Sequence, residues 1–186
     1  MTEPIQHEDI IKTTLSEAWS LFTNDFVLYV LAGLLLLVVS GVSLGLLSGT
    51  MSVGFVMLVE KRRRGEDANA MDIFDGFSQF GASLIATLLI SIGIAIGLFI
   101  FVLPGLIFGL AMLFTYPAIA IDNESATGGM AKSFSIITEN FVLCFMFLLI
   151  VSVLSGLGGA VVFGIVVTLP FNIILITLAY DRLRAA

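Results

Sequence analysis

Few residues of this chain have side chains that could do catalytic chemistry. Gly41-Val42-Ser43-Leu44-Gly45 matches the pattern around the nucleophilic serine of hydrolases and intramembrane serine proteases. Such a serine needs a base to take its proton, and the single histidine, His7, lies in the N-terminal tail. Cys144 has no second cysteine and no basic neighbour. We therefore expect a helix turn or contact at Ser43, a buried apolar role for Cys144, and no catalytic residues: the chain is predicted not to be an enzyme.

Ionisable groups are missing from the parts of the chain that could lie in a membrane. Proton-coupled transporters usually place Asp, Glu or His within the bilayer, and buried metal sites need His, Cys or carboxylate ligands. The long apolar segments of this sequence contain no Asp, Glu or His. We therefore expect no proton coupling, no metal site and no cofactor.

Three residues form a candidate polar and kinked site within apolar sequence. They are Pro117, Pro170 and Asn172. Proline frees a backbone carbonyl, and an amide side chain needs a partner in hydrocarbon. Two interpretations stay open: an interhelical hydrogen bond that only holds the fold together, or a site on a path for a solute or lipid.

The composition indicates an integral membrane protein. The chain has 186 residues, of which 59% are hydrophobic and 12% charged, with a net charge of −6. A soluble domain of this length has too much surface for its volume to hide so many apolar residues. A single cysteine excludes a disulfide framework, and the acidic balance argues against nucleic-acid binding.

The charged residues are confined to four blocks. Three charge-free segments separate them, and each is longer than the roughly 20 residues of one membrane-spanning helix. Turn signals lie near the middle of each segment, at Ser40-Gly41 and Ser43 to Gly45, at Pro104-Gly105, and at 155–159. The blocks are 1–25, 60–75, 122–139 and 181–186, and the segments are 26–59, 76–121 and 140–180.

We therefore predict an all-α fold, a polytopic bundle of six short transmembrane helices arranged as three hairpins. Segment 26–59 would be about 51 Å long as one helix, too long for a normal tilt across a core of about 30 Å. It is also short for a hairpin, so one tilted span stays open for this segment. The predicted helices are 26–40, 43–59, 84–102, 105–121, 141–155 and 160–180.

Three hairpins would place all eight basic residues on one face, which the positive-inside rule makes cytoplasmic. Both termini would then be cytoplasmic. The run Lys61, Arg62, Arg63 and Arg64 directly follows an apolar segment. It is expected to anchor the topology, and it could also attract anionic lipid.

An internal repeat organises the chain. Trp19, Phe77 and Phe134 lie 58 and 57 residues apart, each in an amphipathic stretch just before an apolar run. We predict a single membrane domain over 1–186 with pseudo-repeats at about 9–60, 70–122 and 128–181. Each repeat would be an interfacial helix followed by a hairpin. The three aromatic residues and the basic run form a candidate surface for a partner or lipid.

Short motifs through most of the chain carry a family resemblance. They are Ala18-Trp19 with Asn24, Leu103-Pro104-Gly105-Leu106, Tyr116-Pro117, Ala131 and Ser133 with Asn140, Pro170, and Ala179-Tyr180. With these the chain resembles uncharacterised prokaryotic membrane proteins similar to the membrane domain attached to some glycerophosphodiester phosphodiesterases. The catalytic domain of those enzymes is not present in this sequence. The resemblance implies six helices, a bacterial inner membrane and no assigned activity.

We expect a non-enzymatic scaffold or adaptor that works through its cytoplasmic amphipathic helices. Its partners would be membrane lipid and a protein partner or further copies of itself. A passive channel, or a lipid or small-solute transporter without proton coupling, is the alternative. A shared wet cavity at Ser152, Thr168 and Asn172 would favour the alternative, and dry packing of the helices would favour the scaffold.

Overall fold

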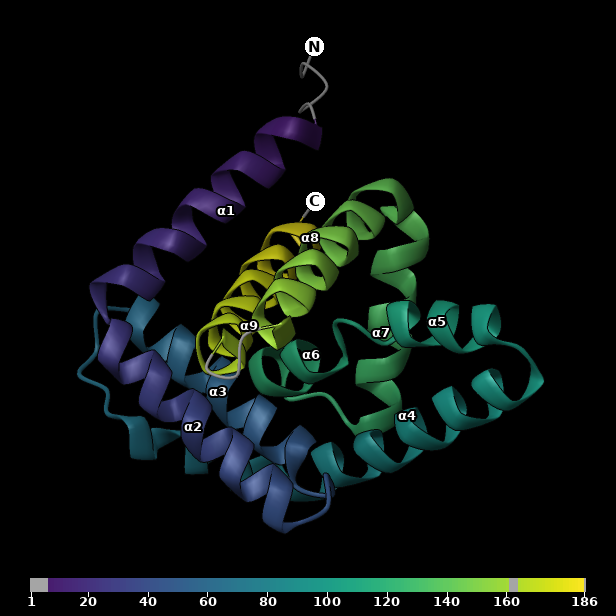
Figure 1. Ribbon diagram of the computed structural model, residues 1–186, viewed down its shortest axis with the longest axis horizontal. Coiled ribbons are helices and arrows are strands. Elements are labelled where there is room, and N and C mark those ends of the chain that lie inside the picture. The colour runs from purple at the N-terminus through teal and green to yellow at the C-terminus, as the bar shows by residue number, and fades with distance from the viewer. Residues whose placement is uncertain (1–6, 161–163, 186) are drawn as a thin grey trace.

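The computed structural model describes residues 7–160 and 164–185, and over these the chain is helical and has no strands. Helix accounts for 87% of the structure, which confirms the predicted all-α class. Figure 1 shows the arrangement. The elements are α1 (His7–Asn24), α2 (Phe26–Val42), α3 (Ser48–Arg63), the 3₁₀ helix η1 (Ala70–Gln79), α4 (Phe80–Ile100), α5 (Val102–Ala111), α6 (Thr115–Asp122), α7 (Ala126–Glu139), α8 (Phe141–Ala160) and α9 (Gly164–Leu183).

Four stretches of helix are long and apolar enough to cross a membrane, which agrees with an integral membrane protein. They are Ala70–Ile100, Val102–Asp122, Phe141–Gly158 and Gly164–Leu183. A fifth is added if α1 and α2, which meet at a bend of 92°, count as one broken span. In Figure 1 the pairs α2–α3, α4–α5 and α8–α9 do not run parallel to one another, and α1 lies alongside α9.

The first apolar segment, 26–59, is two helices and not one tilted helix. A turn at 43–47 separates α2 from α3, which pack on each other. Leu44 and Gly45 have positive φ angles of 52° and 85°, the left-handed backbone that reverses the chain. The Ser43 hydroxyl donates to the Ser40 carbonyl and accepts from the Leu47 N–H. Ser43 is thus a turn residue, as expected.

The second apolar segment breaks earlier than its Pro-Gly pair predicts. The turn between α4 and α5 lies at Phe101, and Pro104 falls in the first turn of α5. Proline is tolerated there because a first-turn N–H has no partner within the helix. The predicted helix 105–121 is also divided, into α5 and α6, by a turn at 112–114.

Ser133 of α7 bridges this second break. Its hydroxyl accepts from the Phe114 N–H at 3.0 Å and donates to the Ala111 carbonyl at 2.7 Å. Both backbone groups lose their helical partners at the turn, and all three residues are buried. A hydroxyl on a neighbouring helix thus makes the interruption possible.

In the third segment the turn predicted at 155–159 is wrong, because these residues continue α8. The connection to α9 falls at 161–163, outside the described residues. One glycine of this stretch, Gly158, serves close packing instead. A Cβ at Gly158 would lie 2.1 Å from the Thr168 hydroxyl of α9.

Helix α3 lies at the centre of the fold. It packs on α2, η1, α4, α6 and α9, and most of its residues are buried. Its approach to η1 is closest at Gly54, where a Cβ would meet the Ile73 carbonyl oxygen at 1.7 Å. Because protein encloses it, α3 does not need the length or the apolar composition of a lipid-facing span.

The junctions after the three amphipathic helices share one backbone geometry. Asp25 and Asn140 are single non-helical residues and Gln79 is the last residue of η1, with φ, ψ of −121°, 40°; −123°, 39°; and −109°, 23°. A phenylalanine begins the next helix each time, at Phe26, Phe80 and Phe141. The internal repeat and its boundaries stay a prediction.

Candidate functional site

The structure brings the four charged blocks of the sequence together. Arg63 of α3 contacts Glu17 of α1 at 3.5 Å and Asp181 of α9 at 3.0 Å. Glu17 also binds Arg182 at 2.6 Å. Arg184 joins Asp181 to Asp122 at the end of α6, and Asp122 in turn binds Lys132 of α7. We call this connected set the charged cluster: Glu17, Arg63, Asp122, Lys132, Asp181, Arg182 and Arg184.

Each member of the basic run has an acidic partner within the chain. Lys61 binds Asp72 of η1 at 2.6 Å, and Arg62 binds both carboxylate oxygens of Asp25. Arg63 belongs to the charged cluster and also binds Glu60, and Arg64 binds the exposed Glu66. The hydrogen bond to Asp72 raises the pKa of Lys61, which stabilises its charged form.

These pairs hold the ends of distant elements in place. Lys61 ties α3 to η1, and Arg62 ties α3 to the junction between α1 and α2. Most of these side chains are part-buried, where ion pairs are screened less than on an open surface. The geometry therefore assigns the basic run a structural role. Binding of anionic lipid by the same residues stays a prediction.

Trp19, Phe77 and Phe134 have large exposed surfaces. Their side chains are 62%, 41% and 54% exposed, on α1, η1 and α7. Trp19 meets the ring of Phe171 edge-on at 6.1 Å, and Phe77 stacks between Phe74 and Phe80. The helices bury other residues instead, among them Ile11, Ala18, Phe22, Ile73, Ile136 and Ile137. The aromatic faces are thus left for lipid or for a partner.

The three residues of the predicted polar and kinked site have different roles in the structure. Pro170 lies inside α9 and packs against α2, where a Cβ on Gly33 would be 3.1 Å from its ring. Pro117 is buried in α6, just after the break at 112–114. Asn172 donates from its amide nitrogen to the Ser155 hydroxyl of α8 at 2.9 Å. This is the interhelical hydrogen bond that the sequence predicts.

Two cavities follow one face of α9. The first, of about 250 Å³, is a groove between α8 and α9 lined by Ser155, Thr168 and Asn172. The second, of about 140 Å³, is lined by Tyr116 and Pro117 of α6 together with residues of α3 and α9. Ile173 lines both. The cavities therefore adjoin at this side chain.

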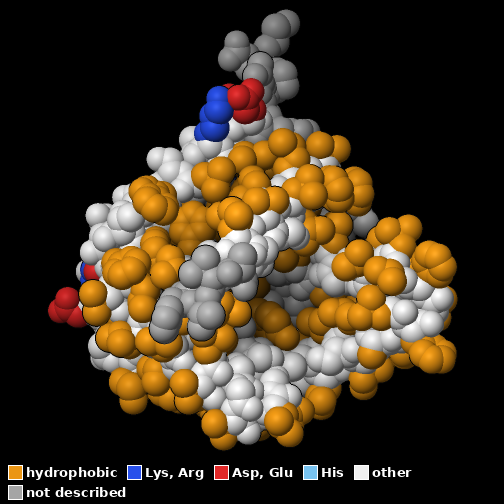
Figure 2. Space-filling model, viewed as in Figure 1, with side chains coloured by type: hydrophobic (Ala, Val, Ile, Leu, Met, Phe, Trp, Pro, Cys, Tyr) orange, Lys and Arg blue, Asp and Glu red, His pale blue; other side chains and the backbone are white. Residues whose placement is uncertain are grey.

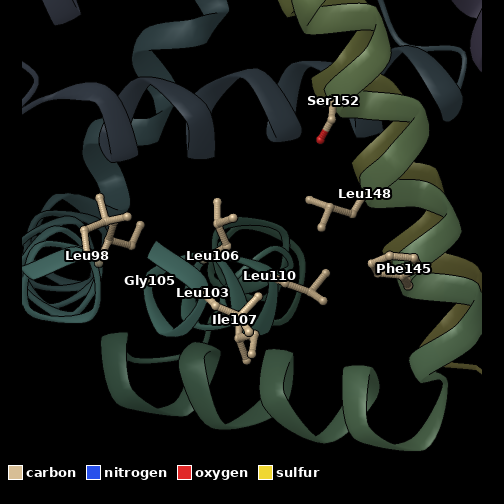
Figure 3. Close-up of a pocket in the computed structure, with 11 residues that line it drawn as sticks. Leu98, Leu103, Gly105, Leu106, Ile107, Leu110, Phe145, Leu148 and Ser152 are labelled. Carbon is tan, nitrogen blue, oxygen red and sulfur yellow. The ribbon is translucent and has the colours of Figure 1, made fainter. Parts of the chain in front are cut away.

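A third cavity, of about 430 Å³, lies between the α4–α5 pair and α8. Figure 3 shows leucine and isoleucine side chains of α4 and α5 on one side and Phe145, Leu148 and Ser152 of α8 on the other. Figure 2 shows the hollow on a face that is otherwise covered by apolar side chains. Ser152 thus faces a different cavity from Thr168 and Asn172. The structure therefore shows neither one cavity shared by the three residues nor helices packed without cavities.

A cluster of buried hydroxyl groups was not identified from the sequence. Thr50 and Ser83 are hydrogen-bonded at 2.8 Å, and Thr87 bonds both the Ser83 carbonyl and the Tyr116 hydroxyl. The cluster joins α3, α4 and α6. Ser83 and Thr87 are four residues apart, and that spacing is the one signal that the sequence offers. Within the described residues no group of three or more His, Cys, Asp or Glu could hold a metal ion.

The chain matches the model of one protein family over residues 1–183. The family is described as a domain of unknown function, DUF7847. No curated protein and no solved structure matches the chain. The resemblance to the phosphodiesterase-associated membrane domain stays a prediction. Because the match covers nearly the whole chain, the protein belongs to the DUF7847 family.

Proposed function

We propose that this protein is a non-enzymatic scaffold or adaptor of a bacterial inner membrane. Its amphipathic helices α1, η1 and α7 would present Trp19, Phe77 and Phe134 to a protein partner. The observation that carries the proposal is the exposure of all three aromatic side chains on helices that the ion pairs hold in place. Tryptophan and phenylalanine are enriched at protein interfaces relative to the rest of the protein surface.

The charged cluster supports the membrane topology on which this proposal rests. Charges from all four blocks meet, although apolar segments of 34 to 46 residues separate them. A charged side chain is costly in hydrocarbon, so the cluster belongs at a membrane surface. Each apolar segment then leaves from and returns to the same surface. This favours six spans in three hairpins, namely α2, α3, α4, α5 with α6, α8 and α9, with both termini cytoplasmic.

The experiment is purification in native-lipid nanodiscs followed by native mass spectrometry. The wild-type complex is expected to contain a second polypeptide at fixed stoichiometry. The combined variant Trp19→Ala, Phe77→Ala and Phe134→Ala is expected to lose it. The matched control combines Phe99→Ala, Phe101→Ala and Leu103→Ala, which remove three more strongly exposed apolar side chains around the α4–α5 turn. The control is expected to keep the partner.

Two results would contradict the scaffold proposal. One is a wild-type protein that carries no second polypeptide. The other is a triple variant that keeps the partner while the variant protein is folded and monodisperse.

A passive path for a neutral solute is the second candidate. The adjoining cavities along α9 favour it, because Ile173 alone lines both of them. Swelling of proteoliposomes in glycerol or urea tests it. Wild-type protein is expected to speed solute entry, and Asn172→Leu is expected to slow it. Ser152→Ala, which alters the other face of α8, serves as the control. Equal flux through wild type and Asn172→Leu would exclude this candidate.

A further inference from the structure

The groove between α8 and α9 contains a buried amide that is only half satisfied. Asn172 is 8% exposed, and its nitrogen bonds Ser155. Its oxygen has no hydrogen-bond partner among the described residues. The Ser155 hydroxyl can donate as well as accept, so an amide turned by half a rotation would pair its oxygen instead. In the arrangement that the structure shows, the amide oxygen is the atom left without a partner.

An unpaired amide atom in an apolar surrounding is costly, so the groove favours an occupant that can pair with it. Thr168 adds a third polar side chain, whose hydroxyl bonds the Gly164 carbonyl. The rest of the wall is formed by Val151, Ile165, Leu169 and Ile173. The oxygen of Asn172 is covered in the empty groove. A turn of the amide about its last torsion, whose energy well is broad, would expose it.

The lining of the groove defines the chemistry of the occupant. None of the residues that line it is ionisable, and a charge would be costly among the apolar ones, so the occupant is neutral. The unpaired atom is an amide oxygen, which only accepts, so the occupant must supply a hydrogen-bond donor such as a hydroxyl. The apolar wall requires an apolar body beside that hydroxyl.

The position of the groove indicates that the occupant comes from the membrane. Asn172 lies eight residues into α9, about 12 Å from its start, near the middle of a span. Ser155 is exposed on the outer surface of α8, so the groove opens sideways. A volume of about 250 Å³ holds the polar end of a lipid and not the whole molecule.

We propose that this groove binds the free hydroxyl of a neutral lipid alcohol, such as a diacylglycerol, at Asn172. The site goes beyond both proposed functions, because a bound lipid alcohol can be a cargo or a structural component. It requires neither a protein partner nor solute flux.

Equilibrium binding of radiolabelled dioctanoylglycerol to the purified full-length protein tests the proposal, with scintillation proximity as the readout. Unlabelled dioctanoylglycerol, its methyl ether and glycerol serve as competitors. The ether keeps the apolar body and loses the donor. Wild-type protein is expected to prefer the alcohol to the ether about tenfold, the discrimination of one hydrogen bond of ordinary strength. Glycerol is expected not to compete.

Asn172→Leu is expected to abolish the preference for the alcohol while keeping the volume of the side chain. Ser152→Ala, on α8 like Ser155 but facing the other cavity, is expected to keep it. Thr168→Val provides a second variant and is expected to weaken the preference, which matters if Asn172→Leu does not fold. Folding is checked by helicity and by size-exclusion chromatography.

Four outcomes would overturn the proposal. The first is absence of binding, which would leave the groove to water alone. The second is equal competition by alcohol and ether, and the third is an unchanged preference in folded Asn172→Leu. The fourth is effective competition by glycerol, which would mean that the groove binds a small polyol from the water phase. The loss of a protein partner in the nanodisc experiment would not affect any of these readouts.

Discussion

The guanidinium of Arg63 and the carboxylate of Asp181 lie 3.0 Å apart, although 118 residues separate them in the chain. Arg63 also contacts Glu17 and Glu60, so one cation serves three acids from α1, α3 and α9. Arg63 thereby links the first hairpin to the last helix.

Removing this cation is expected to destabilise the fold. Arg63→Ala would leave the half-buried Glu60 without its ion-pair partner, and Glu17 and Asp181 would keep only Arg182 and Arg184 as partners. For a part-buried network we expect a loss of about 2 kcal/mol, which for a chain of this size lowers Tm by about 4–8 °C. The control is Arg64→Ala, whose single partner is the exposed Glu66. Thermal unfolding followed by fluorescence-detected size exclusion measures both, and similar Tm values for the two variants would contradict the role given to Arg63.

Ser133→Ala is expected to weaken the break between α5 and α6. The change strands the Phe114 N–H and the Ala111 carbonyl, which are both buried. Each unpaired buried group costs about 1–3 kcal/mol, so Tm should fall clearly. Ser135→Ala on the exposed side of α7 removes only a contact with Glu139 and should have little effect. If the two variants had the same Tm, the bridging role given to Ser133 would be wrong.

Gly54→Ala is expected to separate α3 from η1. A methyl group there would overlap the Ile73 carbonyl and approach the backbone of Gly76. Because both obstacles are main chain, no side-chain rotation can relieve them. Gly41→Ala is the matched control, since a Cβ at that position of α2 meets nothing within 4 Å. We expect the yield of monodisperse protein to fall strongly for Gly54→Ala and to stay normal for Gly41→Ala. A normal yield of Gly54→Ala would contradict the close contact between α3 and η1.

Cysteine labelling tests the proposed topology. In a Cys144→Ser background, Asp67→Cys probes the loop between α3 and η1, and Leu46→Cys probes the turn between α2 and α3. Both residues are exposed. We expect a membrane-impermeant maleimide to label Leu46→Cys in intact spheroplasts and Asp67→Cys only after lysis. Labelling of both from the same side would mean that the first hairpin does not cross the membrane.

The sequence predicts the helical class and the meeting of the four charged blocks, because both follow from keeping charge out of apolar surroundings. It does not predict which charges pair, as for Arg63 with Asp181, since that depends on how distant helices pack. Pro104-Gly105 and the glycines near 155–159 mislead for a common reason. Proline is tolerated in a first helical turn and glycine is used in close packing, so neither residue must mark a chain reversal.

The periodicity of apolar residues does not predict the burial of helix α3 or the elements that surround it. Its packing against η1 depends on Gly54, and its packing against α4 involves the hydroxyl groups of Thr50 and Ser83. None of these residues gives a strong local signal in the sequence. The polar site was predicted in part. Asn172 was identified from its residue type, but its partner Ser155 was placed in an expected turn.

The central position of α3 has a consequence for how the protein is made. Of the five elements that enclose α3, only α2 precedes it in the chain. The ribosome therefore delivers a short, partly polar helix before η1, α4, α6 and α9 exist to cover it. The first hairpin cannot reach its final surroundings until α9, at the end of the chain, has been synthesised. The packing around α3 is thus complete only after α9 has joined it, and a chain that stopped before α9 would leave one side of α3 uncovered.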